Sequence, residues 1–215
     1  MIDVKGIPYY IYARICKVSY GYPKDRTAEL KQLAPGWKIL NEYTNNDILT
    51  VTNNKIVVVC FRGTELKKGV IRSMMDLYND YGILAGENER IFRLDEARPI
   101  VQEIIKKYKK NKVVITGHSL GGFIGLVIAE QYKLKAVLFN IGSSPKDKRF
   151  FDLDKSTYLP KKKSKDIIHI TTNNIRKIPP TIDILSVSSL YFHHIPYYVQ
   201  KVKDGVSIHS IDNFT

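Results

Sequence analysis

Residues 113–123 read VVITGHSLGGF, in which Ser119 lies between two glycines shortly after an apolar run. Glycine two positions before and two positions after the serine removes the Cβ atoms that would collide where a strand turns abruptly into a helix. The apolar run predicts a strand over 112–116, and the residues after the serine predict a helix over 120–133. The stretch therefore predicts a strand–turn–helix unit with one strained, exposed hydroxyl at its bend.

Further strands and helices alternate along the chain on both sides of this unit. Residues 55–61, KIVVVCF, form a β-branched run of the kind that is buried on both faces of a parallel sheet. A long helix is expected over 90–110, with a kink or restart at Pro99, and buried strands over 136–141 and 166–171. Such alternation predicts an α/β sheet with right-handed crossovers. The serine then lies at the carboxyl edge of the sheet, where open α/β sheets bind their ligands.

The N-terminal part of the chain is expected to extend the same domain. Residues 8–20 have the apolar spacing of a helix, and 37–43 and 48–52 read as short strands joined by the turn-forming Asn45-Asn46-Asp47. No repeat or linker divides the 215 residues, of which 44% are apolar. We therefore expect one domain over 1–215 with a sizeable core.

The chain is strongly basic, with a formal net charge of +13. Its lysines gather in 106–112, 145–149 and 159–166. Such runs favour attraction to an anionic surface, phospholipid or nucleic acid, or form a solvated lysine-rich exterior. No dedicated nucleic-acid-binding motif accompanies them. A transient contact with an anionic membrane surface is therefore the partner that the charge favours, and nothing in the sequence specifies an oligomeric state.

The sequence favours an intracellular setting. No apolar run has the length of a transmembrane helix, and the first residues lack the features of a secretory signal peptide. Cys16 and Cys60 are the only cysteines, and Cys60 falls in the predicted buried strand 55–61. We expect two reduced thiols.

A serine hydroxyl becomes a nucleophile when a histidine takes its proton and an acid orients that histidine. Beyond Lys155 the acids are Asp166, Asp183, Asp204 and Asp212, and the histidines are His169, His193, His194 and His209. In hydrolases of this kind the chain order is serine, acid, histidine.

Elimination among these acids favours Asp183. Asp166 would begin a strand at the edge away from the serine, Asp204 lies in a turn sequence, and Asp212 follows His209. Asp183 remains, with a helix cap as its alternative role.

Three segments together resemble the class 3 lipases, the fungal-lipase-like branch of the α/β-hydrolases. They are the stretch VVVCFRGTE over 57–65, the stretch ITGHSLGG over 115–122, and the tail HSIDNF over 209–214. The resemblance runs from about Trp37 to the end. It implies an α/β-hydrolase fold, with a mostly parallel central sheet flanked by helices. It also implies a serine esterase that hydrolyses lipid esters, of triacylglycerol lipase or phospholipase A type, through an acyl-enzyme. No cofactor or metal is expected.

The resemblance also assigns roles to individual residues. Ser119 is the nucleophile and His209 the general base, and the backbone amides of Thr64 and Leu120 form the oxyanion hole. His118 is expected to pack within the turn, since adjacent side chains cannot both address one substrate atom.

Other features keep alternatives open. The family often places its acid shortly after the strand expected at 166–171, where this chain has Asn173 and Asn174. Either Asp183 is the acid, as we predict, or one of these asparagines orients the imidazole. Residues 66–89 form an amphipathic segment, a mobile lid or an ordinary packed helix. The alternative function is a weak or inactive hydrolase-fold protein that binds anionic membrane or nucleic acid through its lysines.

Overall fold

The computed structural model describes residues 2–63, 85–142, 166–171, 197–201, 203, 204, 206 and 210–215. Most of the predicted lid segment 66–89, and the lysine runs 145–149 and 159–165, lie outside these residues.

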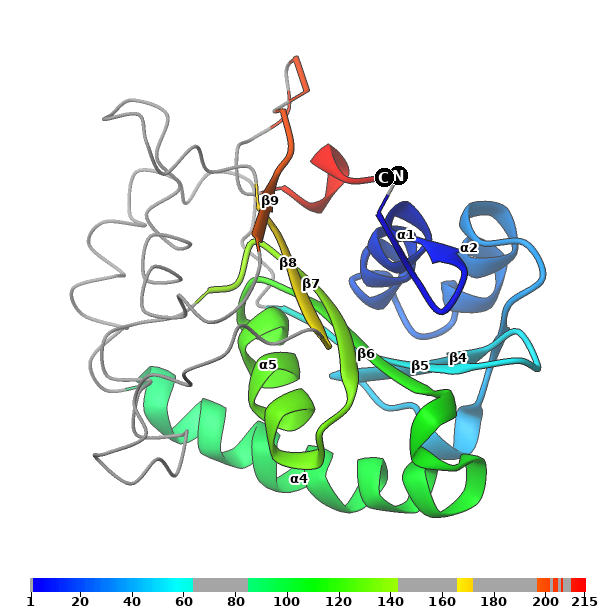
Figure 1. Cartoon of the computed structure of the whole chain (residues 1–215), viewed down its shortest axis with the longest axis vertical. Helices are drawn as coiled ribbons and strands as arrows, with labels where there is room; N and C mark the ends of the chain where they lie inside the picture. Colours follow the sequence, from blue (N-terminus) through cyan, green and yellow to red (C-terminus); the bar gives the residue numbers. More distant parts are fainter. Residues whose placement is uncertain are drawn as a thin grey trace.

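A central sheet organises the described chain (Figure 1), and its strands stand side by side in sequence order. They are β3 (Lys38–Ile39), β4 (Ile48–Thr52), β5 (Val57–Phe61), β6 (Val113–His118), β7 (Lys135–Phe139), β8 (Ile167–Thr171) and β9 (Tyr197–Val199). The pairings β3–β4 and β4–β5 are antiparallel, and every pairing from β5 to β9 is parallel. The predicted α/β class with a mostly parallel sheet is confirmed.

Helices cover both faces of the sheet (Figure 1). Helices α1 (Tyr9–Ser19) and α2 (Arg26–Leu33) lie on one side, and α4 (Ala85–Tyr108) and α5 (Leu120–Tyr132) on the other. Alternate side chains of β5 divide between the two cores. Val57, Val59 and Phe61 pack with α4 and α5, whereas Val58 and Cys60 pack with α1. The predicted double-sided burial of this strand is confirmed.

Short elements complete the described chain. The N-terminal strands β1 (Asp3–Val4) and β2 (Ile7–Pro8) pair with each other and lead into α1. Three 3₁₀ turns follow at η1 (Asn41–Tyr43), η2 (Lys110–Lys112) and η5 (Ile211–Asn213). Helix α2 and strand β9 are additions to the elements expected from the sequence.

Two local predictions need correction. The strand expected over 37–43 is limited to β3, because the Thr44 hydroxyl donates to the Leu40 carbonyl at 2.9 Å and accepts from the Thr50 amide at 3.0 Å, which closes the segment as a turn. Pro99 does not restart the helix, since α4 is continuous. Pro99 is exposed, so the helix carbonyl that loses its amide partner there lies on the side that water can reach.

Candidate active site around Ser119

Ser119 occupies the bend between β6 and α5 with φ +58° and ψ −127°. Residues other than glycine rarely adopt a positive φ, and such strain persists only where surrounding contacts impose it. Here the Ser119 amide donates to the Phe139 carbonyl at 3.1 Å, and the Ser119 carbonyl accepts from the Phe123 and Gly142 amides at 3.2 and 2.9 Å. The predicted strand–turn–helix unit is therefore present, and β7 and its following loop hold its bend.

The two flanking glycines permit close approach, as the sequence argument requires. A Cβ on Gly117 would lie 2.3 Å from the Gly121 carbonyl oxygen, and one on Gly121 would lie 2.0 Å from the Phe61 carbonyl oxygen. Neither backbone oxygen can move away without disrupting the sheet or the helix. The start of α5 is thereby pressed against the end of β5.

Gly63 brings the end of the β5 motif against the same bend. A Cβ there would lie 2.6 Å from the His118 carbonyl oxygen and 3.2 Å from the Ser119 Cβ. The two sequence motifs, 57–65 and 115–122, thus meet in space at Gly63 and Ser119. Thr64, the predicted oxyanion donor that follows Gly63, lies outside the described residues.

Leu120, the second predicted oxyanion donor, is the first residue of α5. Its amide belongs to the first turn, where an amide has no carbonyl partner within its own helix. Gly142 lies beside it: a Cβ on Gly142 would be 3.2 Å from the Leu120 nitrogen and 3.3 Å from the Ser119 Oγ. Sequence reasoning missed Gly142, although a glycine just after a buried strand at the carboxyl edge is a signal of close approach.

His118 packs within the turn, as predicted. It is 5% exposed, and its Nδ1 lies 2.8 Å from the Tyr20 hydroxyl oxygen. That oxygen also accepts a hydrogen bond from the Gly63 backbone, and burial raises the pKa of Tyr20 well above its ordinary value. Tyr20 therefore stays protonated and bridges the two motifs. It was missed by sequence reasoning because it follows α1, far from either motif along the chain.

His169 supports the loop after β7 from the neighbouring strand β8. It is 4% exposed, and its Nε2 accepts a hydrogen bond from the Ile141 amide at 3.3 Å. In the neutral imidazole the proton then resides on Nδ1. This contact fixes the residue just before Gly142, so His169 stabilises one wall of the site.

The other predicted catalytic residues, Asp183 and His209, lie outside the described residues, as do Asn173 and Asn174. The tail resumes at Ser210, directly after His209.

The tail is attached at two points close to the site. The Phe214 ring packs on the Phe139 ring with centroids 5.1 Å apart, and Asp212 pairs with Lys17 at 2.7 Å. Phe139 is also the residue whose carbonyl binds the Ser119 amide. Asp212 is engaged in this ion pair.

The basic run 106–112 lies at the opposite edge of the sheet from Ser119. It ends directly before β6, and Lys133 and Lys55 precede β7 and β5 at the same edge. Lys109, Lys110, Lys112 and Lys133 are exposed. The six residues of β6 separate this edge from Ser119 by about 20 Å, at ~3.3 Å a residue.

Two kinds of feature are absent from the described residues. Within them, no three histidine, cysteine or acidic side chains gather as metal ligands. None of the helices among them combines the length and apolar character needed to cross a membrane.

Comparison with known proteins gives a family and several relatives. Residues 40–138 match the family described as Lipase (class 3). The lipases of Rhizopus niveus and Rhizopus oryzae are each 27% identical over 107 residues, a match that covers 44% of this chain and 27% of theirs. The match thus spans little more than a quarter of the length of these curated relatives.

Solved structures of lipases are also similar. The lipase from Rhizopus microsporus var. chinensis aligns with a TM-score of 0.49 at 18% identity, over 80% of this chain and 68% of its own. Lipase II from Rhizopus niveus aligns with a TM-score of 0.49 at 17% identity, over 80% of this chain and 74% of its own.

Proposed function

Because residues 40–138 match the class 3 lipase family, we propose that this chain is a member of that family and a serine carboxylic ester hydrolase that acts on lipids. Its mostly parallel sheet, with Ser119 at the bend after β6, is the α/β-hydrolase arrangement. One observation supports the proposal more strongly than the others. Ser119 holds a strained φ of +58°, and Gly63 and Gly142 approach it so closely that a Cβ on either would lie within 3.3 Å of its side chain. A purely structural turn has no need of a strained serine in that position.

In the proposed reaction the Ser119 oxygen attacks the ester carbonyl carbon. His209 accepts the serine proton and then donates it to the departing alcohol, which leaves an acyl-enzyme. The Leu120 and Thr64 amides stabilise the negative charge on the carbonyl oxygen in the tetrahedral intermediates. Water, activated by His209, releases the fatty acid and restores Ser119.

The contacts of the tail support the role of His209. Phe214 packs on Phe139, whose carbonyl also binds the Ser119 amide, so the tail is attached next to the nucleophile's own backbone partner. The Asp212–Lys17 pair attaches the same turn to α1. These two contacts hold residues 212 and 214, which follow His209 by three and five positions in the sequence.

The substrate class follows from the family and from the two relatives, which are named as lipases. We propose lipid esters, either acylglycerols or phospholipids cleaved at an acyl ester. Hydrolysis of a panel of triacylglycerol, diacylglycerol and phosphatidylglycerol emulsions, with Ser119→Ala as the blank, separates the lipase from the phospholipase A type.

A fluorophosphonate probe tests the nucleophile, because it phosphonylates an activated serine and leaves other serines unmodified. We expect labelling of the wild type and of Ser19→Ala, whose hydroxyl only donates to the Cys16 carbonyl within α1. We expect none in Ser119→Ala with an unchanged circular dichroism spectrum. Unlabelled but folded wild type would instead favour the alternative, a hydrolase-fold protein that binds through its lysines.

The acid has a separate test. Asp183→Ala should reduce kcat by about 10⁴-fold, the usual loss when a triad carboxylate is removed. Asn173→Ala and Asn174→Ala are matched controls that should retain activity. If one of the asparagine variants shows this loss and Asp183→Ala does not, Asp183 is not the acid.

A further inference from the structure

We propose that Arg93 is a positioning residue for the oxyanion loop, defined here as residues 61–63. This inference rests on the proposed function, since it concerns the segment that presents the Thr64 amide to the substrate. Arg93 belongs to α4, which lies beyond residues 64–84 along the chain.

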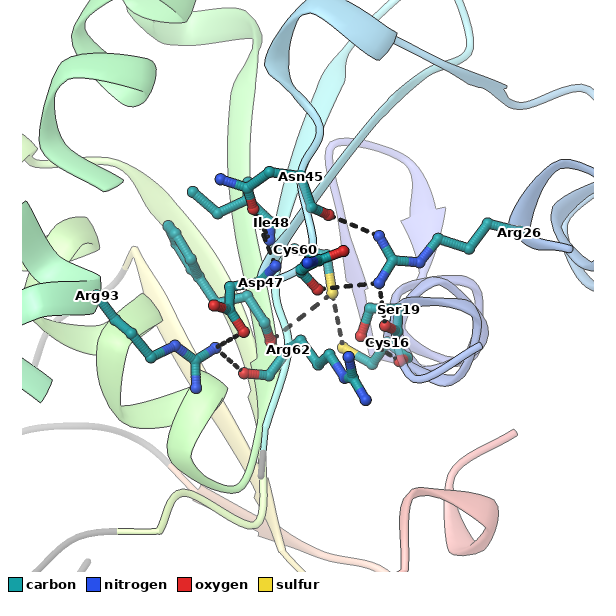
Figure 2. Close-up of polar contacts among 11 residues, drawn as sticks. Cys16, Ser19, Arg26, Asn45, Asp47, Ile48, Cys60, Arg62 and Arg93 are labelled. Carbon is teal, nitrogen blue, oxygen red and sulfur yellow. Dashed lines mark hydrogen bonds and ion pairs between the residues drawn. The ribbon is translucent and has the colours of Figure 1, made fainter. Parts of the chain in front are cut away.

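Both peptide groups of Arg62 are held by partners from other elements (Figure 2). Its amide donates to the Asp47 carbonyl at 2.9 Å. Its carbonyl accepts from the Arg93 Nη2. Residue 62 follows the last residue of β5, so these two bonds replace the strand pairing that ends there. The loop therefore leaves the sheet in a fixed direction.

The Arg93 guanidinium is itself held in place. Its side chain is 5% exposed, and Nη2 also lies 3.5 Å from the Asp47 Oδ1. The same nitrogen thus contacts both a carboxylate and a carbonyl. A guanidinium loses little side-chain entropy for each such bond, because its donors are fixed in a plane. Asp47 consequently contacts both partners, because its carbonyl binds the Arg62 amide and its carboxylate binds Arg93. We call this arrangement of Asp47, Arg62 and Arg93 the clamp.

Hydrogen bonds also hold the turn that carries Asp47 in place. The Asn45 side-chain oxygen accepts from the amides of Asp47 and Ile48 at 2.9 and 2.8 Å. Arg26, which is 1% exposed, donates to the carbonyls of Asn45 and Asn46 at 2.7 and 2.9 Å. Figure 2 shows Arg26 and Arg93 approaching this turn from opposite sides. The clamp is thereby anchored to α2 as well as to α4.

The consequence for catalysis lies one residue further along. Gly63 follows Arg62 and lies so near the nucleophile that a Cβ on it would be 3.2 Å from the Ser119 Cβ, so a shift of residue 62 moves the oxyanion loop relative to Ser119. A displacement of about 1 Å at a reacting centre costs as much as ~100-fold in rate. Arg93 therefore acts through the position of the loop.

The test compares Arg93→Met with Arg98→Met. Methionine keeps an apolar stem of similar length and removes the donors. Arg98 lies on the same helix, and its side chain is partly exposed and pairs with Asp95 at 2.6 Å. Fluorophosphonate titration gives the concentration of active enzyme. The kcat and KM for a soluble short-chain ester, and the inhibition constant of an alkylboronic acid, are then measured for each variant.

We expect Arg93→Met to lower kcat by about 10- to 100-fold with KM within twofold, because the loss falls on the transition state. The boronic acid, which forms a tetrahedral adduct on serine, should lose affinity in parallel. Arg98→Met should stay within twofold of wild type. A merely structural role would reduce the titrated active fraction and leave kcat per active site unchanged.

Each outcome decides the question. If Arg93→Met has wild-type kcat per active site and wild-type affinity for the boronic acid, Arg93 does not position the loop. The proposed hydrolase activity is not affected by that result. A wild type that the probe does not label overturns the proposed function and the clamp with it. If Arg93→Met does not fold, Asp47→Asn serves, since it removes the carboxylate and retains the carbonyl. A threefold or greater loss of kcat with unchanged KM supports the clamp, and a smaller loss overturns it.

Discussion

Replacing Gly142 with alanine should abolish the proposed hydrolase activity while leaving the fold intact. Gly142 does not have a positive φ, so alanine is compatible with its backbone. The added methyl would lie 3.2 Å from the Leu120 nitrogen and 3.3 Å from the Ser119 Oγ. An oxyanion bound to that amide occupies a position ~2.7–3.1 Å from the nitrogen and bonded to the same carbon as the Ser119 oxygen. The methyl and the oxyanion therefore compete for one volume.

The size of the effect follows from these distances. The contacts are short by only a few tenths of an ångström, so overpacking costs about 1–3 kcal/mol and is partly offset by ~0.4–1 kcal/mol from the reduced entropy of the unfolded chain. Denying the oxyanion one donor costs ~2.7–4 kcal/mol of transition-state stabilisation, or about 10²- to 10³-fold in kcat. The catalytic loss thus exceeds the loss of stability.

Gly125→Ala is the matched control. Its methyl would meet the Leu138 Cδ2 at 3.0 Å and the Ile115 Cγ2 at 3.1 Å, a comparable crowding deep in the core beneath α5. Thermal unfolding and hydrolysis of a soluble ester are measured for both variants at equal titrated concentration. We expect similar melting temperatures, with kcat retained in Gly125→Ala and lost in Gly142→Ala. A Gly142→Ala enzyme with full kcat would refute the assignment of the Leu120 amide to the oxyanion hole.

Three further variants or reagents test the surroundings of the site. Tyr20→Phe removes the hydroxyl that accepts from the Gly63 amide. We expect a loss of about 1 kcal/mol in unfolding free energy together with lower kcat. An unchanged melting temperature and unchanged kcat would contradict the role of Tyr20 as a bridge between the two motifs. Burial of Asp212 would raise its pKa, but the hydrogen bond and charge of Lys17 hold it below the ordinary value. Its contribution to stability is therefore present at neutral pH and disappears as pH falls through that lowered pKa, so chemical denaturation of Asp212→Asn and wild type should converge in acid and differ at pH 7. Burial raises the pKa of Cys16 well above its ordinary value, so a thiol reagent should react only as urea unfolds the protein, and rapid reaction of the native protein would count against the buried position.

The sequence predicted the parts of the fold that local pattern determines. Residues 55–61 had to be buried on both faces because no polar side chain interrupts the β-branched run, and the strand packs against α1 on one face and against α4 and α5 on the other. The bend at Ser119 was predictable because a Cβ at position 117 or 121 would lie within 2.3 Å of a backbone oxygen, and glycine has none. In both cases the residues that determine the local structure lie within a few positions of it in the sequence.

The supporting residues of the site could not be predicted in the same way. Tyr20 and Arg93 reach the Gly63 region from helices on opposite faces of the sheet, and their partners include backbone groups, which carry no sequence signal. The strand expected over 37–43 failed for a related reason, because the Thr44 hydroxyl competes with the ladder for the Leu40 carbonyl. Sequence patterns report hydrophobic burial well and side-chain bonds to distant backbone poorly.

The exposed lysines of 106–112 lie far from Ser119. Lys109, Lys110 and Lys112 precede β6 at the sheet edge opposite Ser119, about 20 Å away at ~3.3 Å for each residue of the strand. That distance is more than twice the Debye length of about 8 Å at physiological ionic strength, so their field at the serine is largely screened. An anionic surface held by this cluster would face away from the site. The proposed lipid substrate would therefore reach Ser119 from the carboxyl edge of the sheet. The charge of residues 106–112 then does not favour anionic over neutral lipid as that substrate.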